Sequence, residues 1–187
     1  MSKGRLFVIS GASGVGKSTI LKRVMAARED LQFSVSATTR GARPGEIDGV
    51  HYYFITKEQF RQMISEDCFL EYDDHMDNFY GTPKAQLEEK LAVGHVILDI
   101  EPNGAFAVQK NRPDAVLIFI APPSMEELER RLQGRGDTSP EQIQMRLKRA
   151  EWEMEQRLQY DYVVVNEQRE ACAEQILNII ADKADKN

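Results

Sequence analysis

The sequence predicts an α/β protein whose helices cover a central parallel sheet, and three observations favour this class. Apolar runs at 96–100 and 115–121 have the continuous hydrophobic character of strands that are buried on both faces. Helix start signals with helical spacing of apolar residues lie between those runs. At 5–25 a strand, a glycine loop and a helix are predicted to follow one another. Such alternation is typical of a parallel sheet covered by helices.

The predicted strands of this sheet are all short and apolar. The first, at 5–10, reads RLFVIS and ends at a glycine. After it, apolar side chains at positions 20, 21, 24 and 25 have the spacing of one helix face. The runs at 96–100 and 115–121 supply two more strands, and YVVV at 162–165 is the fourth.

Three later helices carry N-terminal signals. The first is expected to begin at Thr82-Pro83, since proline is favoured in the first turn of a helix. Its apolar face carries Leu87 and Leu91, and Gly94 closes it. The other two begin with a serine that is followed three positions on by an acid or an amide, in the pairs Ser124 with Glu127 and Ser139 with Gln142.

Two segments depart from the alternation of strands and helices. Residues 33–81 contain aromatic and β-branched pieces separated by turn sequences, which predicts a β-rich lobe inserted into the core. Residues 125–158 carry two helical patterns around a glycine-containing turn, which suits a mobile lid. The second of these helices has a stripe that is expected to be buried: Ile143, Leu147, Ala150, Met154 and Leu158. We therefore divide one domain into a core (1–32, 83–123 and 156–187), a lobe (33–82) and a lid (124–155).

Composition and charge argue against several functions. The net charge of −6 is unlike the basic surfaces that grip nucleic acid, so no nucleic-acid partner is expected. The chain has no apolar stretch long enough for a membrane span, and its first apolar run is too short for a signal peptide. Cys68 and Cys172 are too few for a disulfide framework, which favours a reduced, cytoplasmic location.

The segment GASGVGKS at 11–18 matches the phosphate-loop pattern G-x-x-x-x-G-K-[ST] between a strand and a helix. Its glycines allow backbone N–H groups to surround phosphate oxygens, and the helix N-terminus adds positive potential. Lys17 is expected to reach the β and γ phosphates of ATP, and the Ser18 hydroxyl to bind Mg²⁺. An ordinary glycine turn is the alternative. The predicted ATP-binding residues of this segment are Gly11, Ala12, Ser13, Gly14, Val15, Gly16, Lys17, Ser18 and Thr19.

Asp99 follows His-Val-Ile-Leu at the end of a buried strand. A carboxylate in this position organises Mg²⁺ in many phosphate-loop proteins, either through water or through the loop serine. The alternative is that Asp99 caps the following turn.

The chain resembles the guanylate kinases over nearly its whole length. The motifs that carry the resemblance are GASGVGKST, SVSATTRGARPGEIDGVHYYF, FLEY, FYGTP, ILDI, RLQGRGD and YDYVVVN, in that order. The resemblance implies a three-layer P-loop NTPase fold with a GMP-binding lobe and a helical lid. It also implies transfer of the γ-phosphoryl group of ATP to GMP or dGMP, with Mg²⁺ as cofactor. Oligomeric state is left open.

The lobe is expected to bind the acceptor's phosphate. Ser36, Arg40 and Arg43 place a hydroxyl and two guanidiniums around a turn, which suits a phosphate monoester. The alternative for the two arginines is a solvated basic turn. By resemblance they bind the phosphate of GMP, together with the hydroxyls of Tyr52 and Tyr80.

Glu71 is expected to choose the base. A carboxylate can accept hydrogen bonds from guanine N1–H and from its exocyclic amine, a pair that adenine lacks. An exposed strand glutamate is the alternative. By resemblance Thr82 contributes a hydroxyl, although it could also cap its helix. The full set that the resemblance implies for GMP is Ser36, Arg40, Arg43, Tyr52, Glu71, Tyr80, Gly81, Thr82, Asp99 and Glu101.

The chain departs from the family pattern at residues 99–104. The family usually reads Asp-Ile-Asp-x-Gln-Gly, whereas this chain reads Asp-Ile-Glu-Pro-Asn-Gly. The acid at Glu101 is therefore one methylene longer than usual, and a proline follows it. The departure bears on GMP affinity and not on the class of reaction.

Arg131, Arg135 and Arg146 match lid arginines of the family and are expected to neutralise the transferring phosphate. The alternative is a solvated helix surface with Glu/Arg pairs. We prefer that alternative for three other arginines of the segment, namely Arg130, Arg149 and Arg157. By resemblance Asn166 contacts the adenine of ATP, with a turn-forming asparagine as the alternative.

Two other classes of function share parts of this pattern. Guanylate-kinase-like domains also occur as binding modules in scaffold proteins, but those tend to lose the loop residues that this chain keeps as Gly16, Lys17 and Ser18. A kinase for another nucleoside monophosphate would share the loop and lid, but would not be expected to combine Glu71 with Thr82.

Overall fold

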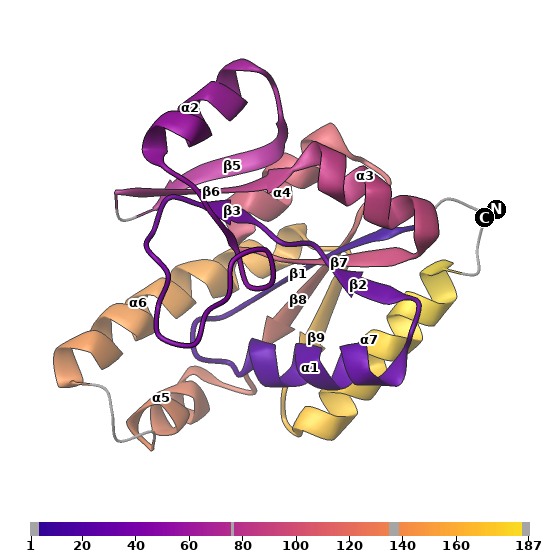
Figure 1. The fold of residues 1–187 in the computed structure, drawn as a ribbon. Coiled ribbons are helices and arrows are strands. Elements are labelled where there is room, and N and C mark those ends of the chain that lie inside the picture. The colour runs from indigo at the N-terminus through magenta and orange to yellow at the C-terminus, as the bar shows by residue number, and fades with distance from the viewer. Residues whose placement is uncertain (1–3, 76, 135–138, 185–187) are drawn as a thin grey trace. The chain divides into compact units, whose positions relative to one another are not determined.

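The computed structural model describes residues 4–75, 77–134 and 139–184. The chain divides into two compact units. The first unit holds Asp30–Ala115 with the residues before Phe7, and the second holds Phe7–Glu29 with the residues from Val116 onward. Each unit contains parallel strands together with helices, and the first unit also contains a separate four-stranded sheet (Figure 1). This arrangement confirms the predicted α/β class.

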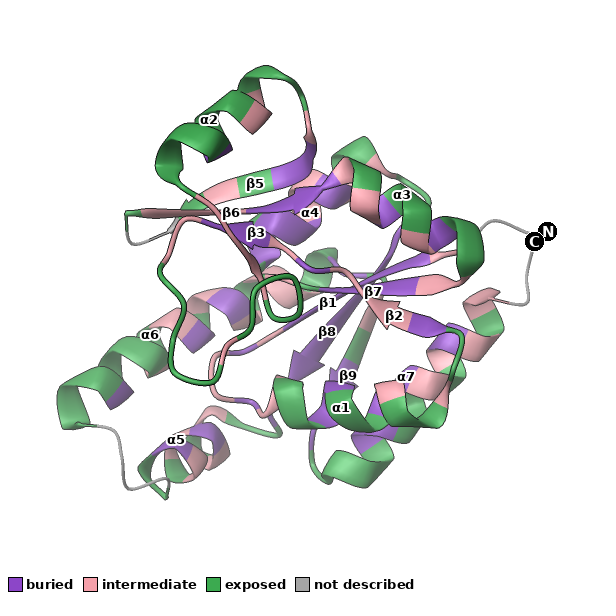
Figure 2. Cartoon of the chain, viewed as in Figure 1, coloured by how far each residue is buried: buried purple, intermediate pink, exposed green. Residues whose placement is uncertain are grey.

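The second unit is built on three parallel strands. They are β1 (Leu6–Gly11), β8 (Val116–Ala121) and β9 (Tyr162–Val165). Strand β8 lies between the other two, with Leu117 opposite Val8 and Phe119 opposite Val163. Every residue of β8 is buried, as its unbroken apolar run requires (Figure 2).

Helices complete the second unit. Helix α1 (Lys17–Ala27) begins at the end of the glycine loop and packs beside α7 (Arg169–Ala184). Helices α5 (Met125–Gln133) and α6 (Pro140–Gln156) pack on each other, and a 3₁₀ turn, η1 (Arg157–Gln159), follows α6. The predicted caps are confirmed: Ser124 Oγ accepts from the Glu127 N–H, and Ser139 forms a capping box with Gln142.

The first unit combines a parallel strand pair with a four-stranded mixed sheet. Strand β2 (Leu31–Phe33) pairs in parallel with β7 (His95–Asp99). The mixed sheet has the order β4 (Tyr53–Phe54), β3 (Ala37–Thr38), β6 (Asn78–Pro83), β5 (Phe69–His75). Helix α2 (Lys57–Ser65) packs on β6, α4 (Pro102–Asn111) packs on β5, and α3 (Lys84–Val93) follows β6.

An aromatic cluster forms the core of the mixed sheet. Phe60 from α2 is fully buried, and its ring stacks on Phe69 at 4.3 Å and on Phe79 at 5.2 Å between centroids. Offset aromatic stacking adds to the free energy of burial. This cluster therefore connects α2 to both strands of the β5–β6 hairpin.

Several local predictions were wrong or incomplete. Thr82 does not cap α3, which begins at Lys84 after Pro83 and has no side-chain cap. Leu158 is 82% exposed, because α6 ends at Gln156 and the 3₁₀ turn rotates the chain out of the helical register. The strand β2 and the helices α2, α4 and α7 were not predicted, although Thr56 and Gln59 form a capping box before α2. None of the described helices is long and apolar enough to cross a bilayer.

Replacing Phe60 with alanine is expected to destabilise the protein by about 3–5 kcal/mol, because it removes a fully buried ring between two others. Phe60→Leu keeps most of the volume and should cost about 1–2 kcal/mol. Urea denaturation curves of the three proteins measure both values. Equal losses for the two variants would contradict the packing described here.

Candidate functional site

The phosphate loop connects β1 to α1 in the second unit. Gly14 and Gly16 have φ angles of 89° and 93°, which L side chains rarely adopt. At Gly14 a Cβ would also lie 2.6 Å from Leu132 of α5. The turn is closed by the Val15 N–H, which donates to the Ala12 carbonyl at 2.9 Å. The sequence pattern and the backbone therefore agree that residues 11–18 form a wound glycine loop at a helix N-terminus.

The side chain of Asn166 is hydrogen-bonded to the backbone of this loop. The side chain is 2% exposed, and its Nδ2 donates to the Val15 carbonyl at 2.8 Å. Its Oδ1 is buried with no hydrogen-bond partner among the described residues. Asn166 was predicted to contact adenine, and the structure places its amide nitrogen on the loop backbone.

Arg131 is anchored close to Asn166. Its Nε donates to Glu127 at 2.7 Å, and its Nη1 donates to the Asn166 carbonyl at 3.1 Å. The hydrogen bonds from Arg130 and Arg131 hold the pKa of Glu127 at about 2, so its carboxylate is ionised at neutral pH. Arg146, in contrast, is exposed on α6 and makes no ion pair with the described residues. Arg135 lies outside the described residues.

Glu153 of α6 was not singled out from the sequence. Its carboxylate is buried, with Oε2 accepting from the Ser13 N–H of the phosphate loop at 2.7 Å. Its Oε1 accepts from Arg149 Nε at 3.1 Å. Glu153 follows Ala150 by three positions, so helical spacing places it on the buried face of α6 and was the signal that could have found it.

The first unit contains a cavity of about 480 Å³, a volume within the range of small-molecule sites. Every residue that the sequence assigned to GMP lines it, except Thr82. Four further residues that sequence reasoning missed also line it: Asp73, Asn78, Ile100 and Gly104. Asp73 could have been found, because it is two positions after Glu71 on the same strand and so faces the same side.

Arg40 lies in this cavity with its guanidinium fixed on several sides. Its Nη1 and Nη2 donate to the two carboxylate oxygens of Glu46, each at 2.9 Å. The guanidinium also lies over the Tyr52 ring at 5.3 Å. The Arg40 hydrogen bonds, with the Arg43 N–H, hold the pKa of Glu46 at about 2. With 15% of its side chain exposed, Arg40 is not the solvated arginine of the alternative interpretation.

Glu71 is 6% exposed, so the exposed-glutamate interpretation is wrong. Thr82 Oγ1 donates to Glu71 Oε1 at 2.6 Å across the β5–β6 pair. A Cβ on Gly104 would lie 3.0 Å from Glu71 Oε2, so glycine there leaves room for the carboxylate. Burial raises the pKa of Glu71, and the nearby Asp73 adds to the rise.

The remaining lining residues supply two kinds of chemical group to the cavity. Arg40, Arg43, Ser36 and Tyr52 supply N–H and O–H donors, and burial raises the pKa of Tyr52 so that its hydroxyl stays protonated. Glu71, Asp73, Asp99 and Glu101 supply carboxylates. A ligand that carries both an anionic group and N–H donors matches these two kinds of group.

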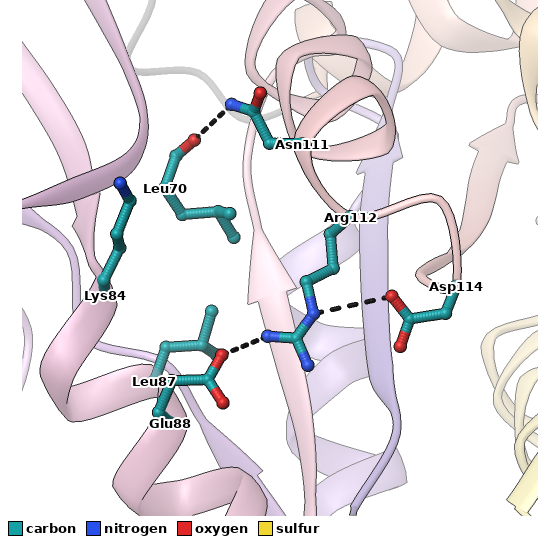
Figure 3. Close-up of a pocket in the computed structure, with 7 residues that line it drawn as sticks. All are labelled: Leu70, Lys84, Leu87, Glu88, Asn111, Arg112 and Asp114. Atoms are coloured by element: carbon teal, nitrogen blue, oxygen red, sulfur yellow. Dashed lines mark hydrogen bonds and ion pairs between the residues drawn. The ribbon is translucent and has the colours of Figure 1, made fainter. Parts of the chain in front are cut away.

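The first unit also has a second hollow, of about 610 Å³, shown in Figure 3. Its charged side chains pair with acids or bases nearby: Arg112 with both Glu88 and Asp114, and Lys84 with Asp67. Asn111 donates to the Leu70 carbonyl at 2.7 Å. Since these charges neutralise one another, the hollow has no charge excess for a nucleotide phosphate.

A phosphate loop in one unit and a cavity with anion donors and carboxylates in the other define a nucleotide-binding P-loop protein of the kinase class. Comparison with known proteins narrows this class. A family model described as Guanylate kinase matches residues 3–183. A guanylate kinase of Thermus thermophilus is 50% identical over 179 residues, which cover 95% of this chain and 81% of that protein.

Two further comparisons agree with this match. The guanylate kinase of Oceanobacillus iheyensis is 47% identical over 95% of this chain and 87% of its own length. The crystal structure of guanylate kinase from Anaplasma phagocytophilum superposes with a TM-score of 0.80, at 37% identity, over 100% of this chain and 89% of that one. The chain belongs to the guanylate kinase family.

The raised pKa of Glu71 predicts how Glu71→Gln will change stability with pH. A raised folded-state pKa stabilises the fold below the ordinary value of 4.5, and this contribution is lost as pH rises through the folded-state value. At neutral pH the ionised carboxylate therefore costs stability. Glutamine keeps an acceptor for Thr82 without the charge, so the variant should be more stable than wild type at pH 8.

Thermal unfolding of both proteins at pH 4 and pH 8, without ligand, measures this difference. The gain from Glu71→Gln should be larger at pH 8 than at pH 4. The exposed Glu89→Gln is the control, and it should show no such dependence on pH. A variant that is destabilised equally at both pH values would contradict the burial of a charged Glu71.

Proposed function

We propose that this member of the guanylate kinase family transfers the γ-phosphoryl group of ATP to GMP, and also to dGMP, giving ADP and GDP or dGDP. The observation that carries the proposal is the buried Glu71 carboxylate in the same cavity as Arg40 and Arg43. Guanine presents N1–H and an exocyclic amine to such a carboxylate, while adenine presents an unprotonated ring nitrogen. The family match over residues 3–183 supports the same acceptor.

In the proposed acceptor complex the phosphate lies among Ser36, Arg40, Arg43, Tyr52 and Tyr80. Arg40 is already oriented by Glu46, which reduces the entropy lost when phosphate binds. The base lies against Glu71, and Thr82 keeps one oxygen of that carboxylate in place. Gly81, Asp99 and Glu101 also line this cavity and are proposed to contact GMP.

In the proposed donor complex residues 11–19 surround the phosphates of ATP. Their N–H groups and the N-terminus of α1 supply positive potential, and Lys17, the first residue of α1, supplies a full charge. Arg131, Arg135 and Arg146 are proposed to neutralise the transferring group. Asn166 is proposed to lie next to the adenine, while its amide holds the loop.

ATP-dependent kinases require a divalent metal, and we propose Mg²⁺ held by the Ser18 hydroxyl and by Asp99, directly or through water. A hydroxyl and a carboxylate are hard oxygen donors that fit Mg²⁺. The described residues contain no cluster of three or more side chains that could hold a metal ion. Mg²⁺ does not require such a cluster, because it takes its remaining ligands from water and phosphate. When bound, the ion would neutralise charge on the β and γ phosphates.

The proposed transfer needs no general base. A phosphate oxygen of GMP, already without its proton at neutral pH, attacks the γ phosphorus in line. The bond from that phosphorus to the bridging oxygen breaks, and the electron pair leaves with ADP. The protein contributes position and charge neutralisation, and it must exclude water to prevent hydrolysis of ATP.

The two alternative functions are less well supported. A scaffold module would not need the intact lysine and glycines of the loop, including two glycines at positive φ. A kinase for AMP would not be served by a buried carboxylate that faces the base. We further propose a cytoplasmic location, in keeping with the free thiols of Cys68 and Cys172.

A coupled assay with ATP and Mg²⁺ tests the proposal on a panel of nucleoside monophosphates. GMP and dGMP should be turned over and AMP, CMP and UMP should not. Lys17→Ala should lower kcat by about 100-fold or more, because it removes a charged donor from the transferring phosphate. Faster turnover of AMP than of GMP, or an unchanged rate in Lys17→Ala, would refute the proposal.

Replacing Glu46 with glutamine should raise KM for GMP by about 3- to 10-fold with little change in kcat, because Arg40 loses its charged orienting partner. Titration calorimetry with GMP and with guanosine separates the causes, since only the phosphate-bearing ligand should bind more weakly. The control Asp67→Asn removes an exposed ion pair with Lys84 and should change neither. Equal losses for GMP and guanosine would contradict the role given to Glu46.

A further inference from the structure

Helix α6 carries an acid where its packing pattern calls for an apolar residue. The buried residues of this helix are Ile143, Ala150 and Glu153, which lie on one face. Glu153 is only 3% exposed. Acidic residues are almost never buried to this extent unless a partner is present, so the position of Glu153 requires an explanation.

The partners of Glu153 explain its burial. One oxygen accepts the Ser13 N–H of the phosphate loop at 2.7 Å, and the other accepts Arg149 Nε at 3.1 Å. Arg149 also lies over the Trp152 ring at 4.8 Å, and a third of its side chain is exposed. The pair differs from the surface pair of Arg130 with Glu127, where the arginine is 76% exposed.

Together with Asn166, Glu153 fixes the phosphate loop at two points. Glu153 holds the N–H of Ser13, and Asn166 holds the carbonyl of Val15. Gly14 lies between these points with φ of 89°. A glycine peptide can rotate easily when it is free, so anchoring both of its neighbours keeps the N–H groups of the loop in one arrangement.

The charge of Glu153 has a second effect. A buried negative charge next to a loop that binds phosphates repels them, unless a cation compensates it. Arg149 supplies that cation. Breaking a buried pair by removal of one partner leaves the other charge uncompensated, which costs far more than the loss of a surface pair.

We propose that Glu153 is a positioning residue for the phosphate loop and that Arg149 is the counter-charge that makes its burial compatible with ATP. The inference rests on the proposed function, because it assumes that the phosphates of ATP lie in this loop. It extends that function to a residue pair on α6. Arg149 therefore has a role beyond the solvated surface that its sequence context indicated.

A double-mutant cycle tests the proposal on the full-length protein, with Arg149→Gln, Glu153→Gln and the double variant. Arg149→Gln should weaken ATP binding by about 10-fold or more, because the buried Glu153 carboxylate loses its ion pair with Arg149. Glu153→Gln should change it by less than about 3-fold, because the amide oxygen still accepts from Ser13. The double variant should recover to within about 3-fold of wild type, because both members of the ion pair are then uncharged.

Titration calorimetry with Mg-ATP measures these affinities, and GMP is titrated into the same samples to show that the acceptor unit is intact. Arg130→Gln is the matched control and should leave both affinities unchanged. Recovery in the double variant with constant GMP affinity would support the proposal. A double variant as weak as Arg149→Gln, or an unaffected Arg149→Gln, would overturn it.

Equal loss of ATP and GMP affinity in every variant would also overturn the inference, since it would indicate a general effect on folding. A wild-type protein that binds no ATP would instead refute the proposed function itself. The two failures are therefore distinguishable in one set of titrations.

Discussion

The buried carboxylate of Glu71 is the charge on which the proposed acceptor site depends. Burial disfavours its ionised form, and the Thr82 hydroxyl, which donates to it, offsets this cost only in part. We propose that a ligand with two adjacent N–H groups satisfies this carboxylate and so compensates for the cost of burying it. Gly104, Thr82 and the β5–β6 register all serve to place it. In this proposal, the free protein loses some stability and gains selectivity for the base of its substrate.

The phosphate loop also depends on buried polar side chains. Asn166 and Glu153 are buried polar side chains that each bond to the loop backbone. Arg40 is oriented by Glu46 in a comparable way. In each case a second residue fixes the group that is proposed to meet the nucleotide, so binding requires less ordering. The proposed site thus includes residues that do not face the substrates themselves.

Local sequence signals predicted the main parts of this fold. The apolar runs of β1, β7, β8 and β9 and the caps at Ser124 and Ser139 depend on neighbours in the sequence, and they are found where expected. The contact of Glu153 with the phosphate loop could not be predicted, since its partner Ser13 is 140 positions away. Resemblance to the family predicted most of the residues that line the cavity. Asp73 could also have been predicted, because alternate residues of a strand face the same side and Asp73 follows Glu71 by two positions. The roles of Arg135 and of the Ser18–Asp99 metal site stay predictions.

The central claim is that Glu71 selects guanine by accepting its two N–H groups. The most direct test compares kcat/KM for GMP and IMP, which differ by the exocyclic amine, in wild type and in Glu71→Gln. Wild type should prefer GMP by about 10- to 100-fold, which is the value of one hydrogen bond to a charged group. The preference should fall to within about 3-fold in the variant, whose amide no longer accepts from both groups. An unchanged GMP-to-IMP ratio would contradict the account.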